Sequence, residues 1–196
     1  MTTATSITSG DLRVPNRGRV LVAPKGSAVP TDTTTVWDAA WSDLGYTDEK
    51  GVTFSKKDTK APIKAWQSIS PVRFILTDRD IHWMFVMEQL NKKTLAVYSN
   101  EGLSAVVANG AVSGEFKLSF SPNPKDQELM MGFEWTDDVN AVTHRVFASR
   151  GSISDTADIP ITHSGLATLG VTYQTMATDQ VTDLVTMLMK DPSMAP

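Results

Sequence analysis

The stretch LMMGFEWTDDVNAVTHRVF, residues 129–147, decides the fold class because apolar side chains recur in it at every second position. The alternating positions are Leu129, Met131, Phe133 and Trp135. A period of two is typical of a β-strand that buries one face. Asp137 and Asp138 follow as a turn, since Asp is a favoured turn residue, and residues 142–147 predict the next strand.

Short strand patterns of this kind recur along the chain and predict an antiparallel β-sandwich or barrel. The other expected strands cover residues 20–23, 51–55, 63–68, 71–77, 94–98, 115–120 and 169–173. Two prolines in residues 121–127 predict a hairpin connection. Residues 181–189 fit both a helix and a final strand, because their apolar positions match either period.

One helix is expected over residues 78–91, flanking the sheet. Thr77 is its candidate N-cap, and Asp78 and Asp80 would favour the positive end of the helix dipole. The residues from Ile81 to Leu90 are apolar on nearly every side, which indicates a helix covered on both faces. We therefore expect Trp83 and Phe85, together with Leu90, to be buried.

A long hairpin is expected at about residues 51–68, with a polar loop at its tip. The loop KKDTK contains Lys56, Lys57, Asp58 and Lys60. Residues 1–16 are rich in Thr and Ser and predict an N-terminal arm. The expected organisation is thus an arm over residues 1–16, a single β-domain over 17–190 and a tail over 191–196.

Composition excludes several classes of protein. The formal net charge is −4, so no global attraction to nucleic acid or anionic membranes is expected. There are no cysteines, which excludes disulfides and thiolate chemistry. No apolar run approaches the roughly 20 residues that span a bilayer, and residues 1–10 lack the features of a signal peptide. A soluble chain made in a cytoplasm is expected.

The sequence contains few side chains of the types that act as nucleophiles or general bases. No enzyme, cofactor or metal site is therefore predicted. The three histidines, His82, His144 and His163, stand without a nucleophile motif. Asp78 and Asp80 are better explained by helix-end charge than by an acid–base pair, since residues two apart on a helix do not face each other. The lysines of the KKDTK loop indicate a solvated turn rather than a nucleic-acid site, which usually needs a broader basic surface.

The segment WDAAWSDLGYTDEKGVTFSKKDTKAPIKAWQSISPVR, residues 37–73, resembles the N-terminal half of major tail (tail tube) proteins of long, non-contractile-tailed bacteriophages, especially those of actinobacterial hosts. The matching features include Trp41, the Leu-Gly-Tyr block at 44–46, Gly-Val-Thr-Phe at 51–54 and Ala-Trp-Gln at 65–67. A Leu-Gly-Val strand at 169–171 also matches, and the resemblance covers about residues 17–176. Family members tend to end on a strand, which favours a strand for residues 180–190.

This resemblance implies a structural virion protein made in the host cytoplasm. Six subunits would form a ring, each giving four strands to an inner barrel, and the rings would stack into a tube around a tape-measure protein. Terminator and tip proteins would be further partners, and DNA would pass through the bore without specific binding. The hairpin loop would reach the next ring, which makes Lys56, Lys57, Asp58 and Lys60 candidate inter-ring contacts.

Two other functions fit the strand pattern. A secreted carbohydrate-binding or adhesin-like β-sandwich would show similar strands, although no signal peptide or exposed aromatic platform is evident in the sequence. A tail-terminator-type virion protein would form one ring and stop. The size of the purified protein separates a lectin-like module, which stays small, from a tube protein.

Overall fold

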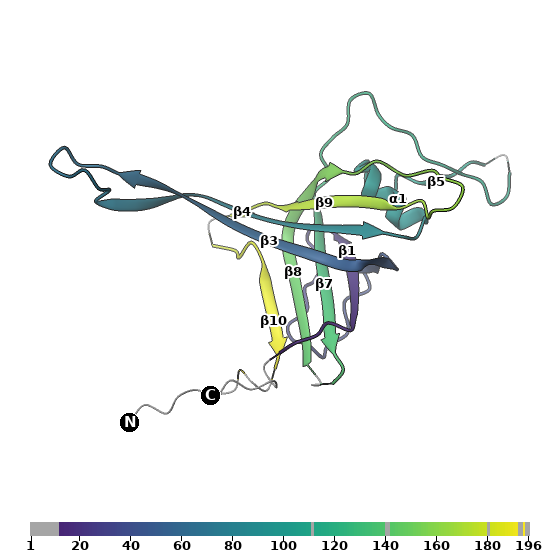
Figure 1. Ribbon diagram of the computed structural model, residues 1–196. Coiled ribbons are helices and arrows are strands. Elements are labelled where there is room, and N and C mark those ends of the chain that lie inside the picture. Colours follow the sequence, from purple (N-terminus) through teal and green to yellow (C-terminus); the bar gives the residue numbers. More distant parts are fainter. Residues whose placement is uncertain (1–11, 111, 140–141, 180, 192–193, 195–196) are drawn as a thin grey trace.

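The fold consists of two layers of antiparallel β-strands that cross each other (Figure 1). The computed structural model describes residues 12–110, 112–139, 142–179, 181–191 and 194. One layer holds β1 (Arg17–Pro24), β2 (Ser42–Asp43), β7 (Leu129–Asp137), the first half of β8 (Val142–Thr156) and β10 (Thr186–Lys190). The other holds β3 (Thr47–Ile63), β4 (Arg73–Met87), β9 (Leu169–Thr175) and the second half of β8. The prediction of a mainly β, antiparallel sandwich with one helix is confirmed.

Strand β8 joins the two layers because it changes partner along its length. Residues 143–147 pair with β10 on one edge, whereas residues 151–156 pair with β9. Gly151 lies at the change and pairs with both Leu129 of β7 and Thr175 of β9. A Cβ at this position would come 2.3 Å from the carbonyl oxygen of Gln174, so only glycine fits.

The main core fills the space between the layers. Its residues alternate along their strands, as a half-buried strand requires. They include Val20, Val22, Trp83, Phe85, Met131, Phe133, Val146, Val171 and Tyr173. Trp83 contacts Phe133 edge to face, with ring centroids 5.1 Å apart. The alternation that predicted strands in the sequence is therefore the pattern of this core.

A second apolar cluster lies on the opposite face of the β1–β7–β8 layer. Leu21 and Ala23 of β1 point to this side and pack with Trp37 and Trp41 of the segment that connects β1 to β2. Trp41 donates a hydrogen bond from Nε1 to the carbonyl oxygen of Ala28, at 2.7 Å. Strand β1 is a continuous apolar run because both of its faces are covered.

The helix predicted over residues 78–91 is wrong, because these residues belong largely to strand β4. Trp83 and Phe85 are buried as expected, at 0% and 3% exposure, but they point into the core of a sandwich. Leu90 lies beyond the strand and is 53% exposed, so its predicted burial is wrong too. Met84 and Val86 point to the other face of β4. Because they are apolar as well, the sequence of this strand does not show the alternation of apolar and polar residues.

The helix α1 (Lys92–Ser99) lies where a strand was predicted at residues 94–98. Asn91 caps it: Oδ1 accepts hydrogen bonds from the backbone N–H of Lys93 at 2.9 Å and of Thr94 at 3.1 Å. Thr94 Oγ1 accepts one in return from the backbone N–H of Asn91, at 3.0 Å. This reciprocal cap is the local signal for a helix start, and the strand prediction overlooked it.

The predicted hairpin exists but extends further along the chain than expected. Strand β3 continues through Lys56 and Lys60 to Ile63, and its partner is β4 rather than residues 63–68. The turn therefore spans residues 64–72, between the paired residues Ile63 and Arg73. The KKDTK segment lies in the strand, so its prediction as a loop is wrong.

Further corrections concern the middle of the chain. The strand expected at residues 115–120 shrinks to β6 (Phe116–Lys117), which pairs with β5 (Val107–Ala108). Residues 121–127 are not a hairpin connection, because β6 and β7 are not paired. At the C-terminus, β10 confirms the strand alternative for residues 186–190.

The two ends of the described chain are tied together. Arg13 donates from Nε to Asp191 Oδ2 at 2.6 Å and from NH2 to Oδ1 at 2.5 Å. Most of the predicted N-terminal arm, residues 1–11, and most of the predicted tail lie outside the described residues. Within the part that the structure describes, no helix is long and apolar enough to cross a membrane.

Candidate assembly surfaces

The hairpin of β3 and β4 projects far beyond the two crossed layers (Figure 1). Pairing continues out to Ile63 and Arg73, so the arm is a regular two-stranded ribbon rather than a loop. An isolated two-stranded ribbon is marginally stable in water. A ribbon of this length is therefore expected to need a covering partner.

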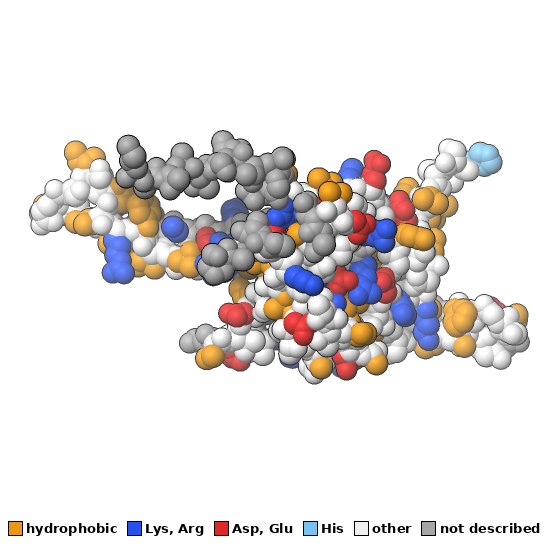
Figure 2. Space-filling view, turned by 90° about the horizontal axis from the view of Figure 1, so that it is seen from below, with side chains coloured by type: hydrophobic (Ala, Val, Ile, Leu, Met, Phe, Trp, Pro, Cys, Tyr) orange, Lys and Arg blue, Asp and Glu red, His pale blue; other side chains and the backbone are white. Residues whose placement is uncertain are grey.

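Large apolar side chains are exposed on the outer half of this arm. Trp66 and Ile69 in the turn are fully exposed. Exposed apolar residues also include Ile63, Val72, Phe74, Ile75 and Leu76. Figure 2 shows hydrophobic side chains at the far end of the projection. Large exposed apolar side chains concentrated on one projection indicate an interaction site.

The four residues predicted to make inter-ring contacts lie together on β3, midway along the arm. Asp58 accepts a hydrogen bond from Arg79 Nε at 2.8 Å and forms an ion pair with Lys56 Nζ at 2.5 Å. The hydrogen bonds from Arg79 and then Lys56 lower the pKa of Asp58 to about 2. Lys57 lies opposite Asp80 in the strand register. The arm therefore carries paired charges here, not an isolated basic tip.

One face of the β8–β9–β4–β3 layer lies away from the core and is largely polar. It carries Thr53 and Ser55 of β3 opposite Met84 and His82 of β4. Asp80 accepts a hydrogen bond from Gln174 Nε2 of β9, and this bond is the main cause of its lowered pKa. Strand β3 pairs only with β4 among the described strands, so its outer edge offers unpaired backbone groups to another chain.

A cleft of about 720 Å³ opens between the layers at the start of β3. Val20, Phe133 and Val146 line it from the core, while Arg17 and Lys50 are exposed at its rim. Asp48 also lines this cleft. Its Oδ1 atom is buried and has no hydrogen-bond partner within the described parts of the chain.

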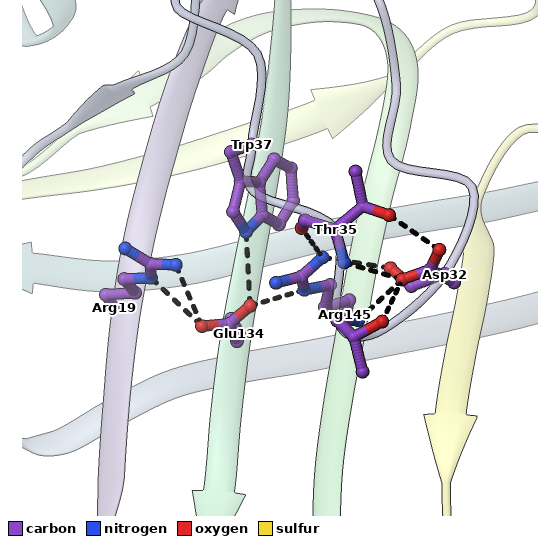
Figure 3. Close-up of polar contacts among 7 residues, drawn as sticks. Arg19, Asp32, Thr35, Trp37, Glu134 and Arg145 are labelled. Carbon is purple, nitrogen blue, oxygen red and sulfur yellow. Dashed lines mark hydrogen bonds and ion pairs between the residues drawn. The ribbon is translucent and has the colours of Figure 1, made fainter.

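The segment between β1 and β2 is held on the sheet by a network around Glu134 (Figure 3). Glu134 Oε2 accepts hydrogen bonds from Arg145 Nε and from Trp37 Nε1, the latter at 3.1 Å, and Oε1 accepts one from Arg19 Nε at 3.1 Å. Burial alone would raise the pKa of Glu134. The hydrogen bonds from Trp37 and Arg145 outweigh it, and the pKa falls.

Arg145 extends this network into residues 25–41, the covering segment between β1 and β2. Its NH1 group donates to the carbonyl oxygens of Asp32 at 2.9 Å and Thr35 at 2.5 Å. Asp32 in turn accepts hydrogen bonds from Thr35 and Thr34, which lower its pKa. One buried guanidinium thus fixes the covering segment to β8, and sequence reasoning did not single out Arg145 for this role.

The residues considered for catalysis are dispersed in the structure. His82 lies on the open face of β4, and His144 is buried against Trp135, with ring centroids 4.0 Å apart. Burial lowers the pKa of His144. Asp137 forms the predicted turn, since its Oδ1 accepts a hydrogen bond from the backbone N–H of Val139 at 3.1 Å. Within the described ranges, no three His, Asp or Glu side chains are grouped to hold a metal.

Comparison with known proteins identifies one family. The sequence model of the phage tail tube protein family matches residues 5–196. A search of curated proteins finds no significant match. The family match covers nearly the whole chain and agrees with the resemblance carried by residues 37–73. The chain belongs to the phage tail tube protein family and is a structural protein of a bacteriophage tail.

Proposed function

We propose that six copies of this protein form a ring and that the rings stack into the tail tube through which the phage genome is delivered. The tube would be assembled in the host cytoplasm around a tape-measure protein and completed by terminator and tip proteins. The protein would act as a building block without catalysis or cofactor. The actinobacterial host range stays a prediction.

The projecting β3–β4 arm is the observation that carries this proposal. Its outer half exposes Trp66, Ile69 and further apolar side chains, although the chain has a complete core without them. Burying apolar surface contributes about 25 cal/mol per Å². An arm that projects away from its own sandwich can gain this stabilisation only against another molecule.

The layer β8–β9–β4–β3 is the candidate wall of the bore. It gives four strands per copy, and 24 strands about 4.8 Å apart, tilted by about 45°, close a circle roughly 50 Å across. Among the strands that the structure describes, β3 has no partner on its outer edge, so the sheet could continue there into the next copy. The face away from the core presents Thr53, Ser55, Thr172 and Gln174, and Asp80 lies opposite Lys57 on it. A face with this little net positive charge would let DNA pass, because few counterions would be released from the phosphates.

Lys56, Lys57, Asp58 and Lys60 stay candidates for the inter-ring contact. Their place on the arm puts them near the surface that a neighbouring copy would cover. Asp58 already pairs with Arg79 and Lys56. Lys57, which lies opposite Asp80 in the register, and Lys60 are both exposed and could contact a neighbour. Such exposed pairs would guide the register of stacking more than its strength.

Replacing the hairpin tip tests the proposal. Ile63 and Arg73 are paired, so residues 64–72 can be exchanged for a two-residue Asn-Gly turn that keeps the hairpin closed. The wild-type protein should form rings or tubes in negative-stain images and light scattering. The shortened variant should stay monomeric with an unchanged circular dichroism spectrum. Wild-type protein that stays monomeric at every concentration and salt tested would refute the proposal.

A further inference from the structure

We propose that the hairpin tip of one copy inserts Trp66 into the cleft between the layers of another copy, an inference that rests on the self-assembly proposed above. The tip and the cleft lie at opposite ends of the same strand. The cleft is lined by residues 47–52 at the start of β3, while the tip follows Ile63 at its end.

The tip cannot reach the cleft of its own copy. Phe54 is the last β3 residue that lines the cleft, and the strand continues from it to Ile63. At about 3.3 Å per residue the tip lies roughly 30 Å beyond the cleft. Figure 1 shows the arm pointing away from the sandwich. A tip that fills the cleft must therefore come from another copy, which the chain itself supplies.

The tip matches the cleft in size and polarity. A cavity of about 720 Å³ falls within the range of about 300–1,000 Å³ that encloses a bulky group. Its inner wall is formed by Val20, Phe133 and Val146, which suit the apolar ring of Trp66. A buried Trp also needs an acceptor for its indole N–H, and Asp48 Oδ1 is a buried acceptor without a donor among the described residues.

The contact would join two unlike surfaces of the same chain. Such head-to-tail contacts close into a ring or continue without limit, depending on the rotation between copies. Each copy carries the inserting tip at one end of β3 and the receiving cleft at the other end. Copies could therefore add to one another in sequence and extend the assembly. The apolar tip would be covered in every copy except those at one end of the assembly.

Cysteine cross-linking tests this contact directly, because the chain has no native cysteine. One preparation carries Gln67→Cys, which leaves Trp66 in place, and a second, tagged preparation carries Lys50→Cys at the exposed rim of the cleft. Mixed under mild oxidation, the two should give a disulfide-linked heterodimer. Lys117→Cys, an exposed position on β6 away from the cleft, is the matched control and should give at least about tenfold less product with Gln67→Cys.

The role of the ring is tested in the same assay. Trp66→Ala in the Gln67→Cys copy should lower the yield of heterodimer by about tenfold or more, whereas Trp66→Phe should retain most of it. Tubes that form without a link between positions 67 and 50, or with equal links to position 117, would overturn the inference and leave the proposed function standing. Wild-type protein that forms no assembly of any kind would refute both.

Discussion

The ring of Tyr173 lies against the backbone of Gly151, so closely that a Cβ atom at residue 151 would come 2.4 Å from its Cζ atom. The hydroxyl group of Tyr173 donates a hydrogen bond of 2.9 Å to the carbonyl oxygen of Leu129. Burial raises the pKa of this phenol, so it remains a donor at ordinary pH. The contact holds β7, β8 and β9 together where β8 passes from one layer to the other.

Substitution Gly151→Ala should destabilise the protein by at least about 1–3 kcal/mol, because the added methyl group overpacks the junction against backbone as well as ring atoms. Chemical denaturation followed by circular dichroism measures the change. Gly110→Ala is the matched control, since a Cβ there meets nothing within 4 Å. Equal stability of the two variants would show that the junction accommodates the methyl group without overpacking.

The two tryptophans of the β3–β4 hairpin region should behave in opposite ways. Trp83 is fully buried, so Trp83→Ala should lower the free energy of unfolding by about 3–5 kcal/mol. Trp66 is fully exposed, so Trp66→Ala should leave the stability of the monomer within about 0.5 kcal/mol of wild type while reducing assembly. Thermal melts and sedimentation of both variants check this. A large loss of monomer stability in Trp66→Ala would mean that the tip folds back onto its own sandwich.

Charge reversal of the arm should slow assembly without unfolding the protein. The variant carries Lys56→Glu, Lys57→Glu and Lys60→Glu, and Lys56→Glu also places a second acid beside Asp58. Exposed ion pairs contribute about 0–1 kcal/mol each, so the effect should appear as a lower rate of tube growth. Microscopy after timed incubation measures it.

The control for the charge reversal changes the net charge equally at three other exposed lysines: Lys92→Glu, Lys93→Glu and Lys117→Glu. Its tubes should grow at nearly the wild-type rate, with folding of both variants checked by circular dichroism. Equal growth rates of the two variants would exclude a specific role for the arm charges.

The covering segment should come away from the sheet in acid. The folded-state pKa of Glu134 lies below its ordinary value of 4.5. The stabilisation by its charge is therefore complete above that value and is lost as the pH falls through the lower, folded pKa. In the wild-type protein, the fluorescence of Trp37 and Trp41 should shift in this acid range relative to its value at neutral pH.

Substitution Glu134→Gln should produce the same change at neutral pH. Arg145 would lose its carboxylate partner while still buried, at a cost of about 3 kcal/mol. It would keep its bonds to the carbonyl oxygens of Asp32 and Thr35, which places the cost at the lower end of the usual range. Unchanged stability and fluorescence in this variant would show that the network does not hold the segment.

The sequence predicts the strands of the sandwich best where one face is apolar and the other polar, as along β9. It fails at β4, because Met84 and Val86 make the second face apolar as well, and an unbroken apolar run does not distinguish a strand from a buried helix. The position of the hairpin tip was missed for a related reason. Residues 56–60 are charged like a loop, yet Asp58 pairs with Lys56 and Arg79 across the ribbon.

The candidate assembly surface could be predicted only in part. Residues 37–73 carry the resemblance that led to the family, and Trp66 stands within it. Its full exposure, however, follows from the pairing of Ile63 with Arg73, which depends on contacts between strands. The cleft is formed by β1, β3, β7, β8 and β10 together, so no single segment of sequence reveals it.

Cryo-electron microscopy of the purified protein after assembly tests the central claim most directly. The account predicts a hollow tube of sixfold rings, a wall of 24 strands to which each copy gives β3, β4, β9 and the second half of β8, and the polar face of these strands towards the bore. Monomers under all conditions, or a tube whose bore is lined by β1, β7 and β10 instead, would contradict it.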